Sequence, residues 1–83
     1  KLPIISSEEL ESHQNKTILF CGWLVTTRRV DTANNQFMKF LTLEDRRGMC
    51  EAVLFPKAYK KYGHLIRSHG PFLLSGRIQS RLP

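Results

Sequence analysis

The segment Met38–Pro56, with the sequence MKFLTLEDRRGMCEAVLFP, decides the fold because it reads as two strands joined by a tight turn. Apolar residues recur with a period of two through Phe37–Leu43 and again through Met49–Phe55, which is the period of a β-strand. The polar turn Glu44–Gly48 ends in a glycine, which is free to take a positive φ angle. The segment therefore predicts an antiparallel hairpin.

The two faces of this hairpin differ in character. The inward-facing sets are predicted to be Phe37, Lys39, Leu41 and Leu43 on the first strand and Cys50, Ala52 and Leu54 on the second, with Lys39 near the rim. The outward-facing sets are Met38, Phe40, Thr42 and Glu44 on the first strand and Met49, Glu51, Val53 and Phe55 on the second. This assignment places two large aromatic rings, those of Phe40 and Phe55, on the face away from the core.

The remaining elements follow from changes in hydrophobic period and from turn residues. They are, in chain order, a short helix capped by Ser6 or Ser7 that ends near Lys16, a strand over Thr17–Val30, a polar loop over Asp31–Gln36, a helix over Pro56–Arg67 weakened at Gly63, and a strand over Phe72–Ile78. Gly22, in the middle of the first strand, predicts a sharp bend where a side chain would collide. Asn34 and Asn35 in the loop tolerate left-handed backbone.

The order of three consecutive strands, a helix and a further strand predicts a mostly β fold. It is the order of the OB-fold, a Greek-key barrel with a helix between its third and fourth strands. We expect residues 1–16 to form a helical lead-in and residues 17–83 to form the OB domain. The fifth strand of the barrel has no counterpart, because residues 79–83 are too few to supply it. We expect this sequence to be a piece of a longer protein, with the closing strand beyond Pro83 or lost.

Composition sets broad limits on function. The chain of 83 residues carries a formal net charge of +6, and no acidic residue follows Glu51. A one-sided positive field favours a polyanionic partner. The sequence contains neither an apolar run that could span a bilayer nor a signal peptide, so we expect a cytoplasmic protein with no membrane partner. Cys21 and Cys50 lie in apolar strand patterns and are predicted to be buried free thiols.

An OB barrel binds single-stranded nucleic acid or oligosaccharide across the face of its second and third strands. Exposed aromatic rings suit this role, because a base stacked on such a ring contributes about 1–3 kcal/mol. The predicted nucleic-acid-binding residues are two rings for stacking and four cations for the phosphates, namely Phe40, Phe55, Arg28, Arg29, Lys39 and Arg77.

Structural alternatives compete with these roles. Phe55 precedes a proline at a strand end, which favours packing under the helix over stacking, whereas for Phe40 the two interpretations are balanced. Trp23 favours packing at the barrel rim, and Tyr59 and Tyr62 are predicted to hold the helix against the barrel. The lysines of this helix are predicted to form a solvent-exposed face first and a phosphate-binding patch second; they are Lys57, Lys60 and Lys61.

Catalytic motifs are missing from the sequence. It contains no nucleophile elbow, no phosphate-cradling glycine loop and no zinc-binding spacing. The three histidines, His13, His64 and His69, are scattered over predicted helix and turn positions. We therefore expect no catalytic residue, no cofactor and no metal in this domain.

Four stretches are similar to the OB domain near the C-terminal end of the bacterial DNA polymerase III alpha subunit. They are FCGWLVT (Phe20–Thr26), MKFLTLED (Met38–Asp45), EAVLFPKAY (Glu51–Tyr59) and GPFLLSGRI (Gly70–Ile78). This resemblance implies a module that binds single-stranded template DNA during replication and adjoins other domains of a DNA-directed DNA polymerase, replicative or error-prone. It places Phe40 and Arg28 among the DNA contacts. The polymerase aspartates of that family lie in another domain, so none is transferred to this chain.

Two other functions stay open. The chain also resembles the anticodon-binding OB domain of a class II aminoacyl-tRNA synthetase at Cys21–Leu24 and Leu43–Gly48, and there Phe40 would stack on an anticodon base while Glu51 would read its edge. The stretch Leu54–Tyr59 favours the polymerase instead. The third function is a protein-docking domain. An incomplete barrel would also leave its sheet edges open, which predicts possible dimerisation through them.

Overall fold

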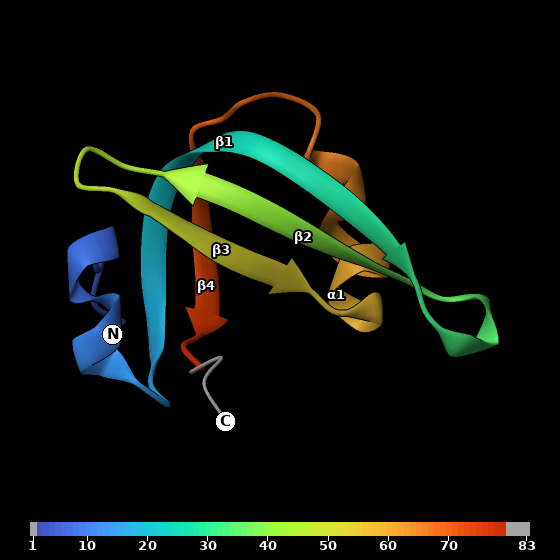
Figure 1. Ribbon diagram of the computed structural model, residues 1–83, viewed down its shortest axis with the longest axis horizontal. Helices are drawn as coiled ribbons and strands as arrows, with labels where there is room; N and C mark the ends of the chain where they lie inside the picture. Colours follow the sequence, from blue (N-terminus) through green and yellow to red (C-terminus); the bar gives the residue numbers. More distant parts are fainter. Residues whose placement is uncertain (1, 80–83) are drawn as a thin grey trace.

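The computed structural model of the chain describes residues 2–79. Its elements are, in chain order, η1 (Ser7–His13), β1 (Thr17–Asp31), η2 (Ala33–Asn35), β2 (Phe37–Glu44), β3 (Met49–Leu54), α1 (Pro56–Tyr62), η3 (Gly63–Leu65) and β4 (Phe72–Arg77), where η marks a 3-10 helix. The strands form one antiparallel sheet in the order β3-β2-β1-β4 (Figure 1). The fold is mostly β, a curled half-barrel with one short α-helix between β3 and β4, which is consistent with the predicted OB-like fold.

Strand β1 curls the sheet because it pairs with a different neighbour along each half. Thr17–Gly22 pairs with β4, and Trp23–Asp31 pairs with β2. Figure 1 shows β1 bending over between these two partners. A Cβ atom on Gly22 would lie 2.6 Å from Cε2 of Phe20 and 2.8 Å from the carbonyl oxygen of Glu44. The collision predicted for a side chain at this bend is therefore confirmed.

The hydrophobic core lies on the inner face of the curled sheet. Its buried members are Ile5, Ile18, Phe20, Leu41 and Leu43. Partly buried residues pack around them, namely Leu10, Leu24, Cys50, Ala52, Leu54, Ile66, Leu74 and Ile78. Because Leu41 and Leu43 are buried while Cys50, Ala52 and Leu54 border them, the predicted inner face of the hairpin is confirmed.

Asp45 closes the turn between β2 and β3. Its carboxylate accepts hydrogen bonds from the N–H groups of Arg47 and Gly48, at 2.8 and 3.0 Å. Gly48 does not use the freedom of a glycine to take a positive φ angle. In the loop before β2, by contrast, Asn34 and Asn35 have φ angles of 66° and 57°, in the left-handed region that their side chains tolerate.

The N-terminal helix docks on the same turn. Its N-cap, Ser6, donates from its N–H and its hydroxyl to the Glu9 carboxylate, at 3.1 and 3.0 Å. The next residue, Ser7, donates from its N–H and its hydroxyl to the Asp45 carboxylate, at 2.8 and 2.7 Å. A Cβ atom on Gly48 would lie 3.2 Å from the Ser7 hydroxyl oxygen. The glycine therefore allows the close approach of η1 and is not required by its φ angle.

The α-helix after β3 ends at the position where Gly63 was predicted to weaken it. α1 ends at Tyr62 and gives way to η3, which begins at Gly63. The ring of Tyr59 packs edge-on against Phe37 of β2, with centroids 6.3 Å apart, so the predicted contact between helix and barrel is confirmed for this residue. The side chain of Tyr62 is 46% exposed, and the barrel does not bury it.

The two cysteines occupy different environments. Both are free thiols, as predicted, and Cys50 borders the core. Cys21 is exposed, so its predicted burial is wrong. It lies between the buried residues Phe20 and Gly22 on β1, and the alternation of the strand turns its side chain to the outer side.

Strands β3 and β4 form the two edges of the sheet that residues 2–79 make. The prediction about a fifth strand falls on residues 79–83, of which 80–83 lie outside the described part of the chain. Over the described range, no helix is both long and apolar enough to traverse a bilayer.

Candidate nucleic-acid interface

The outer face of β1, β2 and β3 carries a shallow hollow of about 270 Å³. The residues that line it come from all three strands and are Thr26, Thr27, Arg28, Phe40, Thr42 and Glu51. The strand register explains most of this grouping, because Arg28 lies opposite Phe40 and Thr42 lies between Thr26 and Glu51, whereas Thr27 lies opposite the buried Leu41. The sequence predicted ligand contacts at Arg28, Phe40 and, for an anticodon, Glu51. Thr42 was placed on the outward face with Phe40 but without a binding role, and Thr26 and Thr27 were missed.

Arg28 and Phe40 form the centre of this hollow. The guanidinium carbon of Arg28 lies 4.6 Å from the centroid of the Phe40 ring, which is a cation–π distance. Arg28 is exposed and Phe40 is half-buried. The guanidinium therefore lies over the ring, and the pair offers a planar cation, backed by the ring, on which a base can stack and from which the charge can reach a phosphate.

An irregularity in β1 decides which arginine reaches this face. The register between β1 and β2 shifts between Leu24 and Thr26, which gives β1 one extra residue, Val25. Leu24 packs against the core, so uninterrupted alternation would have turned Arg28 inward and Arg29 outward. The bulge reverses this assignment, since such irregularities re-aim the side chains that follow them.

Arg29 and Lys39 lie on the other face of the sheet, opposite each other in the β1–β2 register. The guanidinium carbon of Arg29 is 4.6 Å from the centroid of the Phe37 ring, and Nζ of Lys39 is 5.9 Å from that of Tyr59. The structure thus separates these two predicted cations from the hollow at Arg28. They alternate with aromatic rings beside α1.

The last two predicted residues lie away from this centre. Phe55 directly precedes α1 and is 57% exposed, so the packing under the helix that its sequence context favoured is not observed. Arg77 ends β4, opposite Thr17, at the far end of β1 from Arg28. Trp23, which was predicted to pack at the rim, is 51% exposed.

Arg28 is the cation and Glu51 the carboxylate among the side chains that line this hollow. Arg29 is 4.0 Å from Asp31 and Arg47 is 3.3 Å from Glu8, both exposed pairs. Within residues 2–79 no ion pair involves Arg28. Nor do the described histidine, cysteine and acidic side chains form any group of three that could hold a metal ion. The ring, the hydroxyl groups and the cation of this face are able to stack, to hydrogen-bond and to attract an anion.

Comparison with known proteins finds similarity to DNA polymerase III alpha subunits. The chain is 35% identical over 54 residues to the DNA polymerase III subunit alpha of Staphylococcus aureus strain N315, and 33% identical over 54 residues to that of Staphylococcus epidermidis. Each match covers 65% of this chain and 5% of the polymerase. No protein-family model and no solved structure matches the chain. The partial homology supports a polymerase-associated domain.

Proposed function

We propose that this chain is a non-catalytic OB domain of a bacterial DNA polymerase III alpha subunit, and that it binds single-stranded template DNA during replication in the cytoplasm. The observation that carries the proposal is the pairing of Arg28 with Phe40 on an outer sheet face that none of the helices within residues 2–79 covers (Figure 1). The similarity to polymerase chains supports DNA as the ligand. The remaining domains of the polymerase are the other proposed partners.

The binding chemistry follows from the residues of the hollow. A base stacks on the ring and guanidinium of Phe40 and Arg28, which suits every base because each has a π face. Arg28 also neutralises a phosphate. The hydroxyl groups of Thr26 and Thr42 supply donors and acceptors for the edge of the base or for the backbone. Because stacking carries no sequence code, we propose binding with little sequence preference.

The test is fluorescence anisotropy of labelled oligothymidine titrated with the chain at low salt. Phe40→Ala should weaken binding by about 1–3 kcal/mol, because it removes one stacking surface. Tyr62→Ala is the matched control, since Tyr62 is an exposed ring on α1, and it should leave the affinity unchanged. Equal affinities for the wild type and Phe40→Ala, or no binding by the wild type, would overturn the proposal.

A tRNA anticodon is the second candidate ligand. The observation that favours it is the position of Glu51, which lines the same hollow as Phe40 and can accept hydrogen bonds from the amino group of a base. Competition separates the two functions. Unlabelled single-stranded DNA should displace the oligothymidine at lower concentration than an RNA anticodon stem-loop, and the reverse order would favour the synthetase function. A chain indifferent to both would point to protein docking.

The sheet edges suggest a possible self-association. β3 and β4 each have a neighbour on one side only among the described strands, and such edges can pair with another chain. We propose a concentration-dependent dimer through these edges. Analytical ultracentrifugation over a range of protein concentrations tests it, and a single monomeric species throughout would exclude it.

A further inference from the structure

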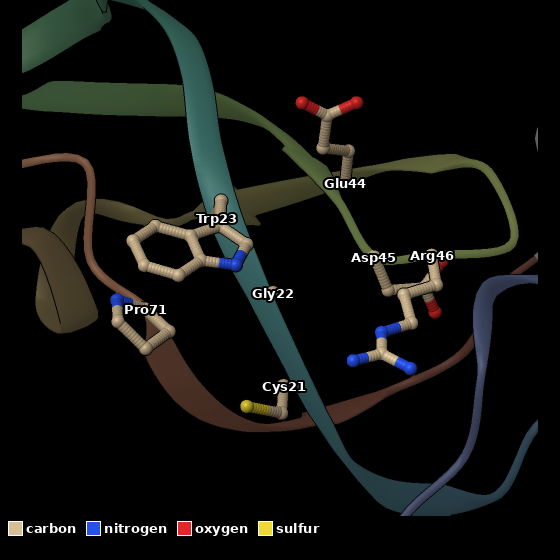
Figure 2. Close-up of a pocket in the computed structure, with 7 residues that line it drawn as sticks. All are labelled: Cys21, Gly22, Trp23, Glu44, Asp45, Arg46 and Pro71. Atoms are coloured by element: carbon tan, nitrogen blue, oxygen red, sulfur yellow. The ribbon is translucent and has the colours of Figure 1, made fainter.

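A second hollow, of about 330 Å³, opens beside β1 and has no role in the site described above. Its lining comes from β1, the end of β2, the β2–β3 turn and the residue before β4, and consists of Cys21, Gly22, Trp23, Glu44, Asp45, Arg46 and Pro71. Figure 2 shows the Trp23 indole near the Pro71 ring, with the Arg46 guanidinium on the other side of the ribbon of β1. Trp23 is 51% exposed, which is unusual for a ring that only packs a rim.

The strand register puts Trp23 on the same outer side of the sheet as Phe40. Trp23 pairs with Glu44, and the residues that alternate along β2 from Glu44 lead through Thr42 to Phe40. The bulge at Val25 keeps this face continuous on β1 as well. The two hollows are therefore separated by about 13 Å along β2, at about 3.3 Å per residue. An extended single strand of a few nucleotides covers that distance.

The charged groups around Trp23 leave one cation available. The Arg47 guanidinium lies 3.3 Å from the Glu8 carboxylate, whereas Arg46 forms no ion pair among the described residues. The carboxylate of Asp45 is directed to the N–H groups of its own turn and to Ser7. In Figure 2 the carboxylate of Glu44 points away from the Arg46 guanidinium. The hollow thus combines a large stacking surface with one cation.

We infer that this hollow is a second base-binding subsite, in which Trp23 stacks on one base of the same DNA strand that Phe40 contacts and Arg46 reaches the adjoining phosphate. The inference rests on the proposed function. Stacking supplies most of the affinity here, because Glu44 and Asp45 limit the attraction of the hollow for phosphates.

The chain carries its own probe for this subsite, since Trp23 is its single tryptophan. Unlabelled oligothymidine should quench the Trp23 emission with the same midpoint as the anisotropy titration. An oligonucleotide of equal length with abasic sites in place of its bases keeps the phosphates and should leave the emission nearly unchanged. Binding seen by anisotropy with constant Trp23 emission would overturn the subsite and leave the proposed function standing. Absence of any binding would overturn both.

Cys21 gives a second measurement that needs no substitution. Its exposed thiol lines the same hollow, so bound oligothymidine should slow its modification by a thiol reagent at least several-fold. An unchanged rate at saturating DNA would contradict the subsite.

Substitutions measure how much Trp23 and Arg46 contribute to the affinity for DNA. Trp23→Ala should weaken binding about five-fold or more, and Trp23→Phe should retain much of the affinity because it keeps a ring.

Arg46→Ala should reduce the slope of log affinity against log salt concentration by about 0.7, the value for one phosphate on a single strand. Arg47→Ala is the matched control, as the Arg47 guanidinium is held by Glu8, and it should leave the slope unchanged. Equal slopes for Arg46→Ala and wild type would overturn the role of Arg46.

Discussion

Arg28 and Phe40 face each other across the β1–β2 ladder, and the guanidinium carbon of the arginine lies 4.6 Å from the centroid of the ring. The neighbouring Arg29 makes the same kind of contact with Phe37 at the same distance, on the opposite face. Two adjacent arginines thus lie on opposite faces of the sheet, each over a phenylalanine ring. A ligand that binds one face should therefore respond to substitution of one arginine and not of the other.

Arg28→Ala and Arg29→Ala should therefore affect DNA binding unequally. Arg28→Ala should lower the affinity for oligothymidine and reduce the salt slope by about 0.7, because it removes a phosphate contact on the outer face. Arg29→Ala changes the net charge by the same amount and should leave the slope near the wild-type value. Anisotropy titrations at several salt concentrations give both slopes. Equal losses in the two variants would show that the charge acts at long range rather than from one face.

Gly22→Ala should destabilise the fold by about 1–3 kcal/mol, because the new methyl group meets the Glu44 carbonyl at 2.8 Å and backbone atoms there cannot move aside. Gly76→Ala is the matched control, since a Cβ atom at Gly76 meets no atom within 4 Å. That change should leave stability unaltered or raise it by a few tenths of a kcal/mol. Urea denaturation of the two variants measures the difference, and similar midpoints would refute the packing argument.

Asp45 should make the fold sensitive to acid. Burial acts to raise the pKa of its carboxyl group, but the hydrogen bonds from Ser7, Arg47 and Gly48 outweigh burial and lower the pKa to about 2. The pKa of an aspartate in an unfolded chain is about 3.9. Because the folded-state pKa is the lower one, the carboxylate stabilises the fold above about pH 4, and this stabilisation is lost as the pH falls toward 2.

Asp45→Asn should therefore lower the free energy of unfolding at neutral pH by roughly 1 kcal/mol, a value reduced by solvent screening of this largely exposed carboxylate, and flatten the dependence of stability on pH between 4 and 2. Asp31→Asn is the control, as its exposed pairing with Arg29 at 4.0 Å contributes at most about 1 kcal/mol. Thermal melts across this pH range provide the measurement. A pH profile of Asp45→Asn parallel to that of the wild type would contradict the role of the carboxylate.

The two thiols should react at very different rates. Cys21 is exposed, whereas burial and the nearby charge of Asp45 raise the pKa of the Cys50 thiol to about 11. The thiolate is the reactive form, so Cys50 should resist a thiol reagent at pH 8 until the chain unfolds. Mass spectrometry after brief labelling should find one modified site, at Cys21. Labelling of both cysteines at comparable rates in the folded chain would refute this prediction.

Much of the fold could be predicted because alternation of apolar residues is strong in the hairpin. Leu41 and Leu43 alternate with the polar residues Thr42 and Glu44, and one inward face follows directly. The alternation of β1 is ambiguous because both of its sets are apolar, so the exposure of Cys21 could not be foreseen. The sequence did not show that the φ angle of Gly48 stays negative, because the turn residues alone do not reveal the hydrogen bonds that the Asp45 carboxylate accepts.

The candidate site was less predictable than the fold. A single extra residue, Val25, determines which side of the sheet Arg28 and Arg29 occupy, and no composition signal marks that bulge. Lys39 was predicted to point inward near the rim of the barrel. The structure accommodates its charge there by a cation–π contact with the Tyr59 ring. That contact joins residues of two elements, which a pattern within one strand cannot show.

The double pairing of β1 has a consequence for the cooperativity of the domain. β1 is the only described strand hydrogen-bonded to β2 along one half and to β4 along the other, so neither half of the sheet can open without releasing it. Its amide hydrogens should therefore exchange with solvent only through global unfolding, while those at the outer edges of β3 and β4 exchange through local opening. Arg28 and Trp23 thus belong to the strand that is the last to unfold, so the backbone that carries both side chains stays in place whenever the domain is folded.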